Sequence, residues 1–299
     1  MTSLAAGRRT ASRSSGRLAS EVTAAAGLLP FGALVVLFLV IPLGVVFAGA
    51  LLDEAGRPTL GGLAALGDPV VRSAFARSFE LSAITAAVGA VLGAVVAAVV
   101  AGSSPTSVLR RVVVAACGVL SQFAGVPLAF ALVATIGLSG VVTQLLGGAG
   151  VDLYASGVWL FDTPGLVLAY TCFQVPLMVI VFLPALDGVR PAWREASLTL
   201  GGTRWQHFRL VSVPVLAPAF TGALLLLFAN ALSAYATAAA LVSQGSSIVP
   251  LQIRRALSSD VLVGQQDLAS TLAVGMVLVV AVVMGAQALV QRRTARWLR

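Results

Sequence analysis

Side chains that could do nucleophilic, acid–base or metal chemistry are few and far apart in this chain. The single histidine, His207, has no cysteine or carboxylate at metal-ligand spacing and is expected at the surface or at headgroup level. Cys117 and Cys172 each fall inside an apolar run, where a thiol acts as a small hydrophobic side chain. Ser/His pairs, paired carboxylates and ligand clusters are not visible within the apolar runs, so we expect neither a metal site nor intramembrane catalysis.

Neutral polar side chains inside the apolar runs are a second chemical feature. Asn230, Ser233 and Thr237 recur at i, i+3 and i+7, which predicts one shared helix face. Amides and hydroxyls there could line a path for a polar solute, because intramembrane polar residues gather on interior faces. The alternative is hydrogen bonding that only packs helices together. The candidate path residues are Gln122, Gln174, Asn230, Ser233, Tyr235 and Thr237.

A polar break, REASLTLGGTRWQHFRLVSVP at 194–214, interrupts the otherwise apolar second half of the chain. Pro191 suits a first helical turn, so a short helix is expected over 192–200. Gly201 suits the left-handed position that follows a helix. Thr203 is placed to cap a second short helix, 204–212, which is expected to end at Pro214, where the next span begins.

This helix–glycine–helix elbow has two interpretations. It could dock a protein partner, because small residues at 196 and 197 allow close approach. It could also be an amphipathic linker that places Trp205 and Phe208 among lipid headgroups.

The composition requires a membrane to hold these elements. Hydrophobic residues make up 59% of the chain and charged residues 10%, and the mean hydropathy is +0.99. A soluble domain carries about 25% charged residues. A span needs roughly 20 apolar residues, and six runs reach that length, which predicts an all-α polytopic membrane protein. The predicted spans are 28–52, 74–101, 112–138, 164–187, 214–243 and 266–291, with kinks expected at Pro42, Pro127 and Pro176.

The charges divide the chain and orient it. Residues 1–27 are expected to be a disordered cytoplasmic tail, 28–291 the six-helix domain with the elbow loop 188–213, and 292–299 a basic cytoplasmic tail. Most of the 19 basic residues fall in these tails and in the loops 102–111 and 188–213. Because positive residues favour the cytoplasm, both termini and the elbow are expected inside. All of the basic residues are arginine, so the chain has no lysine for a Walker A site.

The elbow resembles a known motif. The chain has Glu195-Ala196-Ser197, three residues, Gly201, nine residues, and then Val211-Ser212-Val213-Pro214. This is similar to the Glu-Ala-Ala…Gly…Ile-x-Leu-Pro motif of permease subunits of binding-protein-dependent type I ABC importers. Ser197, Val211 and Val213 depart from the motif, each with a side chain of similar or smaller size. The resemblance implies that an ATPase is coupled through Arg194, Glu195, Ala196, Ser197, Leu200, Gly201, Gly202 and Pro214.

The resemblance extends over most of the chain and implies a set of partners. LLPFGALVVLFLVIPLGVVFAGAL, RSFELSAITAAVGAVLGAVVAAVVA and GLSGVVTQLL look like the spermidine/putrescine subgroup, which also includes phosphonate, iron and sulfate permeases. The family implies a heterodimeric pair of permeases in a bacterial inner membrane, two ABC ATPase subunits, and an extracytoplasmic solute-binding protein. ATP and Mg²⁺ are expected in the ATPases, no cofactor in this chain, and no nucleic-acid partner. A small polar solute such as a polyamine or a phosphonate is expected.

A secondary transporter acting without an ATPase is the rival class. Such carriers generally place ionisable groups near the middle of the bilayer. Here Arg77 and Glu80 lie close to the outer end of the second span, where they can pair or extend toward water. The sequence therefore favours the importer permease.

Overall fold

The protein is a bundle of long helices in a computed structural model that describes residues 29–51, 57, 67–155, 157–242, 248–258 and 265–295. The predicted tail 1–27 lies outside the described residues. In the loop 52–66 only Arg57 is described, and in the loop 243–264 only residues 248–258 are described. Within the described part, six helical stretches are long and apolar enough to cross a membrane. The predicted all-α, six-span class is confirmed.

The element order follows the predicted spans, with short helices between them. The first span runs through a π-helical turn, η1 (Val36–Val40), into α2 (Ile41–Leu51), and is followed by α4 (Pro69–Ala101), α5 (Val108–Gln122), α6 (Val126–Ile136) and α7 (Val141–Gly148). The short turn η3 (Trp159–Phe161) leads into α8 (Thr163–Asp187). The second half contains α9 (Pro191–Thr199), α10 (Arg204–His207), η4 (Phe208–Ser212), α11 (Val213–Ser233), α12 (Ala236–Leu241), α13 (Val249–Ser258) and α14 (Gln265–Ala295).

Helices α4 and α8 form the most intimate contact of the bundle. Gly89 on α4 leaves room for the side chain of Gln174, since a Cβ at position 89 would lie 2.8 Å from Gln174 Cβ. Gly93, one turn further, faces Met178 in the same way. Small residues four apart let helix backbones approach closely in a membrane, where dispersion contacts drive association. This contact holds α8 in place, and α8 leads directly into the elbow.

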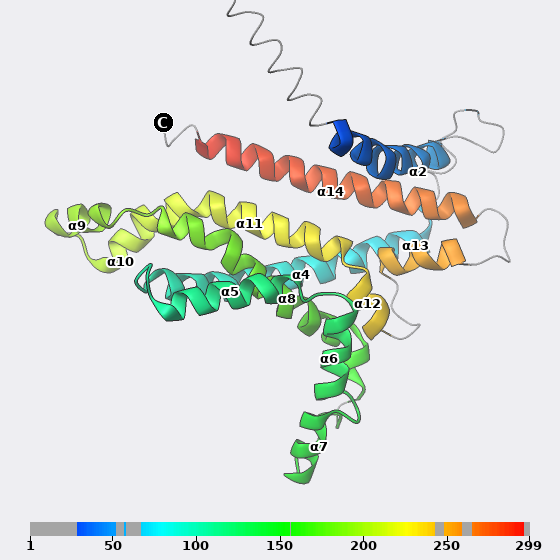
Figure 1. Cartoon of the computed structure of the whole chain (residues 1–299), viewed down its shortest axis with the longest axis horizontal. Coiled ribbons are helices and arrows are strands. Elements are labelled where there is room, and N and C mark those ends of the chain that lie inside the picture. The colour runs from blue at the N-terminus through cyan, green and yellow to red at the C-terminus, as the bar shows by residue number, and fades with distance from the viewer. Residues whose placement is uncertain are drawn as a thin grey trace, which may run out of the picture.

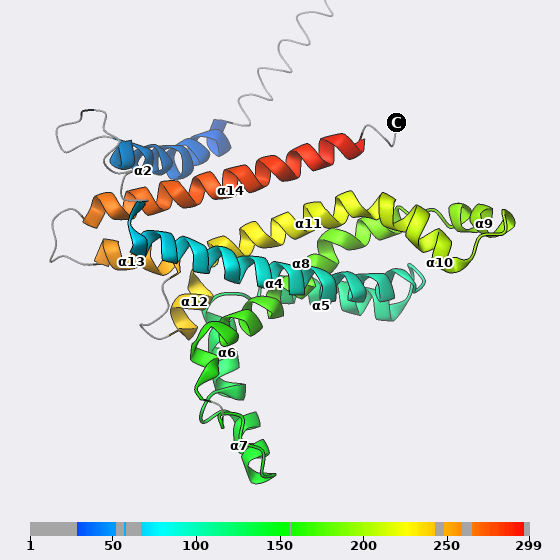
Figure 2. The same cartoon turned by 180° about the vertical axis from the view of Figure 1, so that it is seen from behind.

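The two ends of the bundle are distinct (Figure 1, Figure 2). The α9–α10 elbow, the connection between α4 and α5, and the C-terminal end of α14 lie at one end, which we call the elbow end. The start of α4, α13 and the start of α14 lie at the opposite end. Helices α6 and α7 form an arm that projects away from the other helices in both views.

Two predicted spans are interrupted rather than continuous. The predicted span 112–138 is divided at residues 123–125 into α5 and α6, so the third membrane-length helix is instead Val126–Gly148. Gly125 there has φ +83°, and Pro127 begins the next helix rather than kinking the span. The predicted span 214–243 is divided at residues 234–235 into α11 and α12.

The helix expected to end at Pro214 instead continues. Arg204–Ser233 is one 30-residue helical stretch that includes the π-helical turn η4 two residues before Pro214. Proline has no N–H for the carbonyl four residues earlier and crowds it with its ring. The wider π turn accommodates that conflict without a break. The first span uses the same device, because η1 ends two residues before Pro42.

Two further elements differ from the prediction. Residues 249–258, expected in a loop, form α13, whose Val249 backbone N–H donates to Ser78 Oγ on α4 at 2.8 Å. Helix α14 continues to Ala295, past the expected end of the last span at 291.

Candidate functional site

The first half of the elbow is a short helix with a tightly closed end. Pro191 occupies its first turn, as predicted. After the helix, the Gly201 N–H donates to the Leu198 carbonyl at 3.0 Å and the Gly202 N–H donates to the Ser197 carbonyl at 2.9 Å. Gly201 has φ +82°. This is a Schellman closure, which satisfies carbonyls that the helix end would leave unpaired.

The second half begins with a reciprocal cap. The Gln206 backbone N–H donates to Thr203 Oγ1 at 3.2 Å, and the Thr203 backbone N–H donates to Gln206 Oε1 at 2.8 Å. The predicted role of Thr203 as a cap is confirmed, and Gln206 completes a capping box. Both halves of the elbow are therefore fixed by bonds within their own few residues.

His207 is not the surface residue expected from the sequence. It is only 7% exposed, and its Nε2 lies 3.3 Å from Ser212 Oγ, across the π-helical turn. The ring therefore spans the wider turn that joins the elbow to α11. The sequence showed a lone histidine among arginines and could not show that the helix would continue and bury it.

The tip of the elbow presents apolar and charged side chains together. Leu200 is 89% exposed and Trp205 is 66% exposed and stacks on Phe208. Arg194, Glu195 and Ala196 are also exposed, while Ser197 is half-buried. An exposed apolar tip beside charges has the character of a protein or membrane contact surface. Pro214, the last residue of the motif, lies further along at the start of α11.

An ion pair connects the end of α8, just before the elbow, to α5. Asp187 ends α8, with three residues between it and the start of α9, and its carboxylate pairs with the Arg110 guanidinium on α5. Arg110 is one of the basic residues of the loop 102–111 that predict the orientation of the chain. Its partner lies 77 residues away, so no local pattern indicated the pair.

The two helix breaks meet at one place. The Gly125 N–H, in the break between α5 and α6, donates to Thr237 Oγ1 on α12 at 2.8 Å. The Tyr170 hydroxyl of α8 donates to the Ala234 carbonyl, in the break between α11 and α12, at 2.5 Å. Backbone groups that lost helical partners are thus satisfied by side chains from other helices, as a bilayer interior demands.

These breaks change the predicted stripe at 230, 233 and 237. Because α11 ends at Ser233, Thr237 is on a different helix and does not continue the face of Asn230 and Ser233. Thr237 is 2% exposed and holds Gly125, whereas Asn230, Ser233 and Tyr235 are exposed. Gln122 is exposed at the end of α5, beside the other break. The prediction that residues 230, 233 and 237 share one helical face was therefore wrong.

Gln174 lies between helices. It has no exposed surface, and its Nε2 donates to Thr85 Oγ1 of α4 at 3.2 Å. Its Oε1 has no hydrogen-bond partner within the described part of the chain. In this conformation Gln174 belongs to the α4–α8 packing, beside Gly89.

A polar cavity opens at the end opposite the elbow. It has a volume of about 360 Å³ between α4, the start of α8 and Ile248. Arg77, Glu80, Asp162 and Thr163 line it above an apolar floor. Arg77 and Glu80 were expected near the outer end of the second span, but no sequence signal connected them with Asp162.

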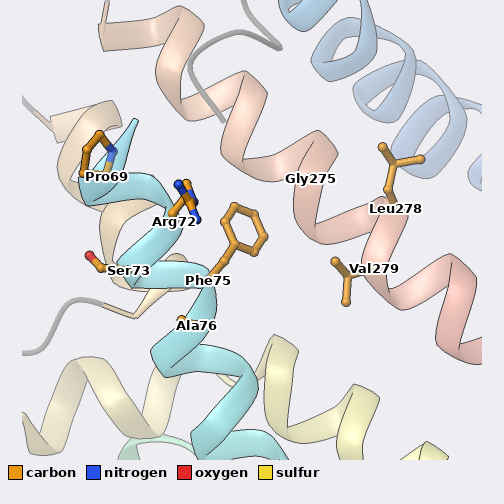
Figure 3. Close-up of a pocket in the computed structure, with 8 residues that line it drawn as sticks. All are labelled: Pro69, Arg72, Ser73, Phe75, Ala76, Gly275, Leu278 and Val279. Atoms are coloured by element: carbon orange, nitrogen blue, oxygen red, sulfur yellow. The ribbon is translucent and has the colours of Figure 1, made fainter. Parts of the chain in front are cut away.

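A larger cavity of about 770 Å³ lies between α4 and α14 (Figure 3). Phe75 and Val279 point toward the space between the two helices, while Arg72 and Ser73 lie nearer the start of α4. Its lining is mostly hydrocarbon, which suits an acyl chain better than a polar solute. The polar cavity is therefore the better candidate for solute contact.

Comparisons with known proteins agree on one family. Residues 89–296 match the family model described as "Binding-protein-dependent transport system inner membrane component". The sulfate transport system permease protein CysT of Escherichia coli is 33% identical over 28% of this chain and 29% of its own length. The putative ferric transport system permease protein FbpB 1 of Haemophilus influenzae is 32% identical over 33% of this chain and 15% of its own length. The molybdenum transport system permease protein ModB of Escherichia coli is 34% identical over 28% of this chain and 36% of its own length.

A solved structure shares the fold along nearly the whole chain. It is the crystal structure of a bacterial ABC transporter involved in the import of the acidic polysaccharide alginate, with a TM-score of 0.73 and 17% identity. The match covers 95% of this chain and 99% of that one. The family match contains the elbow, both helix breaks and the helices that carry them. The chain therefore belongs to the family of inner membrane components of binding-protein-dependent transport systems.

Proposed function

We propose that this chain is the non-catalytic, membrane-spanning permease subunit of an ATP-driven importer. The observation that carries the proposal is the elbow, a self-closed pair of short helices that extends beyond the bundle and ends in an exposed apolar tip. It lies inside the stretch that matches the family. Two ATPase subunits bind the elbows of two permeases, of which this chain supplies one, and ATP is hydrolysed in the partners.

Within that role, the elbow is the coupling element. Leu200 inserts into an apolar recess of the ATPase, and Glu195 pairs with a basic residue beside it. The Schellman closure and the capping box make the elbow a rigid body. A displacement of its tip therefore moves the ends of α8 and α11 instead of bending the elbow.

The solute path follows the interrupted helices. Gln122, Asn230, Ser233 and Tyr235 are exposed polar side chains that lie at or next to the two breaks. Discontinuous helices bring helix ends to membrane depth, which suits polar or charged solutes. The cavity of Arg77, Glu80 and Asp162 receives the solute from an extracytoplasmic binding protein.

The membrane orientation follows from the arginines. The elbow end and both termini face the cytoplasm, with the loops 52–70 and 244–264 outside. Single cysteines introduced in those two loops should react with an impermeant maleimide in intact cells. Reaction only after permeabilisation would reverse the orientation.

The solute is a small polar molecule. Relatives are named for sulfate, molybdenum and ferric transport, while the segments resembling the spermidine/putrescine subgroup point to polyamines or phosphonates. The scarcity of acidic residues within the spans makes a polyamine the weaker candidate. A thermal-shift screen of the cognate binding protein against sulfate, molybdate, ferric iron, a phosphonate and spermidine tests these candidates.

The function is tested by capturing the membrane complex through a tag on this chain. A P-loop ATPase should co-purify, and Glu195→Arg should weaken its retention while the chain still inserts, because position 195 lies outside every span. Arg204→Glu, a charge reversal at an exposed position of α10 outside the coupling set, shows whether any charge change has the same effect. Transport by the lone chain in liposomes, with no ATPase captured, would support a secondary carrier instead.

A further inference from the structure

Helix α5 buries little of its surface but has a polar connection at each end. Of its 15 residues only Cys117 is buried, and its main packing neighbour is α8. Yet each end of α5 has a polar connection to a distant element. Arg110 near its start pairs with Asp187, and the break that follows its end is held by Thr237 of α12. A stiff helix joined at both ends can carry a displacement between them.

The ion pair at the start of α5 is placed against the helix dipoles. Arg110 lies in the first turn of α5 and Asp187 is the last residue of α8. Helix N-termini favour acids and C-termini favour bases, so neither charge stabilises its own helix. The Arg110 side chain is nevertheless only 13% exposed, compared with 42% for Asp187. The pair is therefore better explained as a connection between the two helices than as capping of either one.

The connection at the far end of α5 is equally specific. Gly125 has φ +83° and its N–H has no helical partner, so the hydroxyl of Thr237 holds it from a buried position. Thr237 lies in α12, which packs along α6. The break at 123–125 is thus connected, through Thr237, to the break at 234–235.

We propose that α5 is a connecting rod: the Arg110–Asp187 pair passes displacement of the elbow to α5, and Gly125–Thr237 passes it to the paired helix breaks. Arg110 and Asp187 are then positioning residues of the transport cycle. The inference rests on the proposed coupling role of the elbow. It adds a route by which ATPase closure reaches the solute path without passing through α11.

The test uses the captured complex with a thiol reporter at the end of α5. Gln122→Cys is introduced with Cys117→Ala and Cys172→Ala, and the rate of labelling by N-ethylmaleimide is measured with and without ATP plus vanadate. Nucleotide should change this rate by about fivefold, a typical coupling between distant sites. Arg110→Gln and Asp187→Asn should each reduce the change to less than about twofold.

A charge exchange separates the pair from general damage. Arg110→Asp combined with Asp187→Arg should restore the nucleotide response, because it rebuilds the pair and also suits both helix dipoles. Arg111→Ala removes the adjacent exposed arginine and should leave the response intact.

Three outcomes would contradict the proposal that α5 passes displacement from the elbow to the helix breaks. They are an unresponsive parent reporter, single variants that respond like the parent, and an exchange that fails to restore a lost response. Each of these leaves the proposed function standing if ATPase subunits are captured with the chain. Absence of captured ATPase would instead contradict the proposed function itself.

Discussion

The elbow and the break between α5 and α6 both contain a glycine at positive φ but are held in opposite ways. Gly201 and Gly125 have nearly identical φ values, +82° and +83°. Around Gly201, each bond that closes the elbow joins residues at most five apart in sequence. Around Gly125, the bond that holds the break comes from Thr237, 112 residues away, and the companion bond from Tyr170 spans 64 residues.

This difference in how the two segments are held determines which of them depends on the rest of the bundle. A segment closed by its own bonds keeps its shape wherever the bundle places it, which suits a rigid contact element. A segment held by distant side chains depends on the arrangement of the bundle and changes when that arrangement changes. Local bonds thus fix the shape of the elbow by itself, whereas the breaks keep their shape only in this arrangement of the bundle; this contrast fits the proposed coupling role of the elbow.

The largest expected effect is at Gly201. Gly201→Val places a β-branched residue at positive φ, which costs about 1–2 kcal/mol. A Cβ there meets no neighbouring atom within 4 Å, so the cost comes from the backbone conformation rather than from a clash. Uptake and stimulated ATP hydrolysis should be lost because the elbow opens. Gly201→Asn, which tolerates the left-handed region, should retain most of the activity; equal loss in both variants would contradict a backbone role.

A smaller, several-fold loss of uptake is expected in the path. Asn230→Leu and Ser233→Leu replace exposed polar groups next to the break with bulk, and the complex should still assemble. Thr221→Leu is the matched control, because Thr221 is exposed on the same helix and donates to the Ala217 carbonyl just as Ser233 donates to that of Ala229. The same loss of uptake in the control would mean that these residues only pack.

At the breaks, Thr237→Val should destabilise the purified complex. It removes the acceptor of the Gly125 N–H at a buried site, which costs about 1–3 kcal/mol. The thermal midpoint in detergent should fall, while Thr237→Ser, which keeps the hydroxyl, should stay close to the parent. A valine variant as stable as the parent would show that water or lipid can replace the bond.

The smallest effect is expected at the capping box. Thr203→Ala removes a cap that is worth about 1 kcal/mol. Because the bonds are local, the first turn of α10 should fray without a change in the midpoint of the bundle. Faster hydrogen exchange confined to residues 203–207 would establish this, whereas faster exchange spreading into α11 would contradict the local character of the elbow.

The same distinction explains what could be predicted from the sequence. The first elbow helix, the Gly201 turn and the Thr203 cap were predicted to within a residue, because Pro191, Gly201 and Thr203 are local signals. The number of spans followed from apolar run length, but the third and fifth spans begin and end elsewhere than predicted. The break at 234–235 has neither glycine nor proline, and Tyr170 was an ordinary residue in an apolar run, so only the assembled bundle reveals why the chain breaks there.

Two other differences from the prediction arise where a proline follows a local change in the helix. Gly125 and Pro127 stand two residues apart, a combination that marks a helix end followed by a new start. It was interpreted as one kinked span. Pro214 was taken to separate two helices, because proline usually does so, and the wider turn before it was not foreseen.

The π-helical turn η4 also determines how the elbow is rotated about the axis of α11. In an α-helix each residue advances the side chain by about 100° around the axis. A π turn carries one extra residue, so the elbow side of Phe208–Ser212 is rotated by about that amount relative to an uninterrupted helix. The spacing between Gly201 and Pro214 is then an angular measure as well as a length, because it fixes which way the elbow's tip faces when α11 is seated in the bundle. Removing one residue from the turn would leave the side chains of the tip unchanged but rotate the tip by about a quarter of a circle relative to α11.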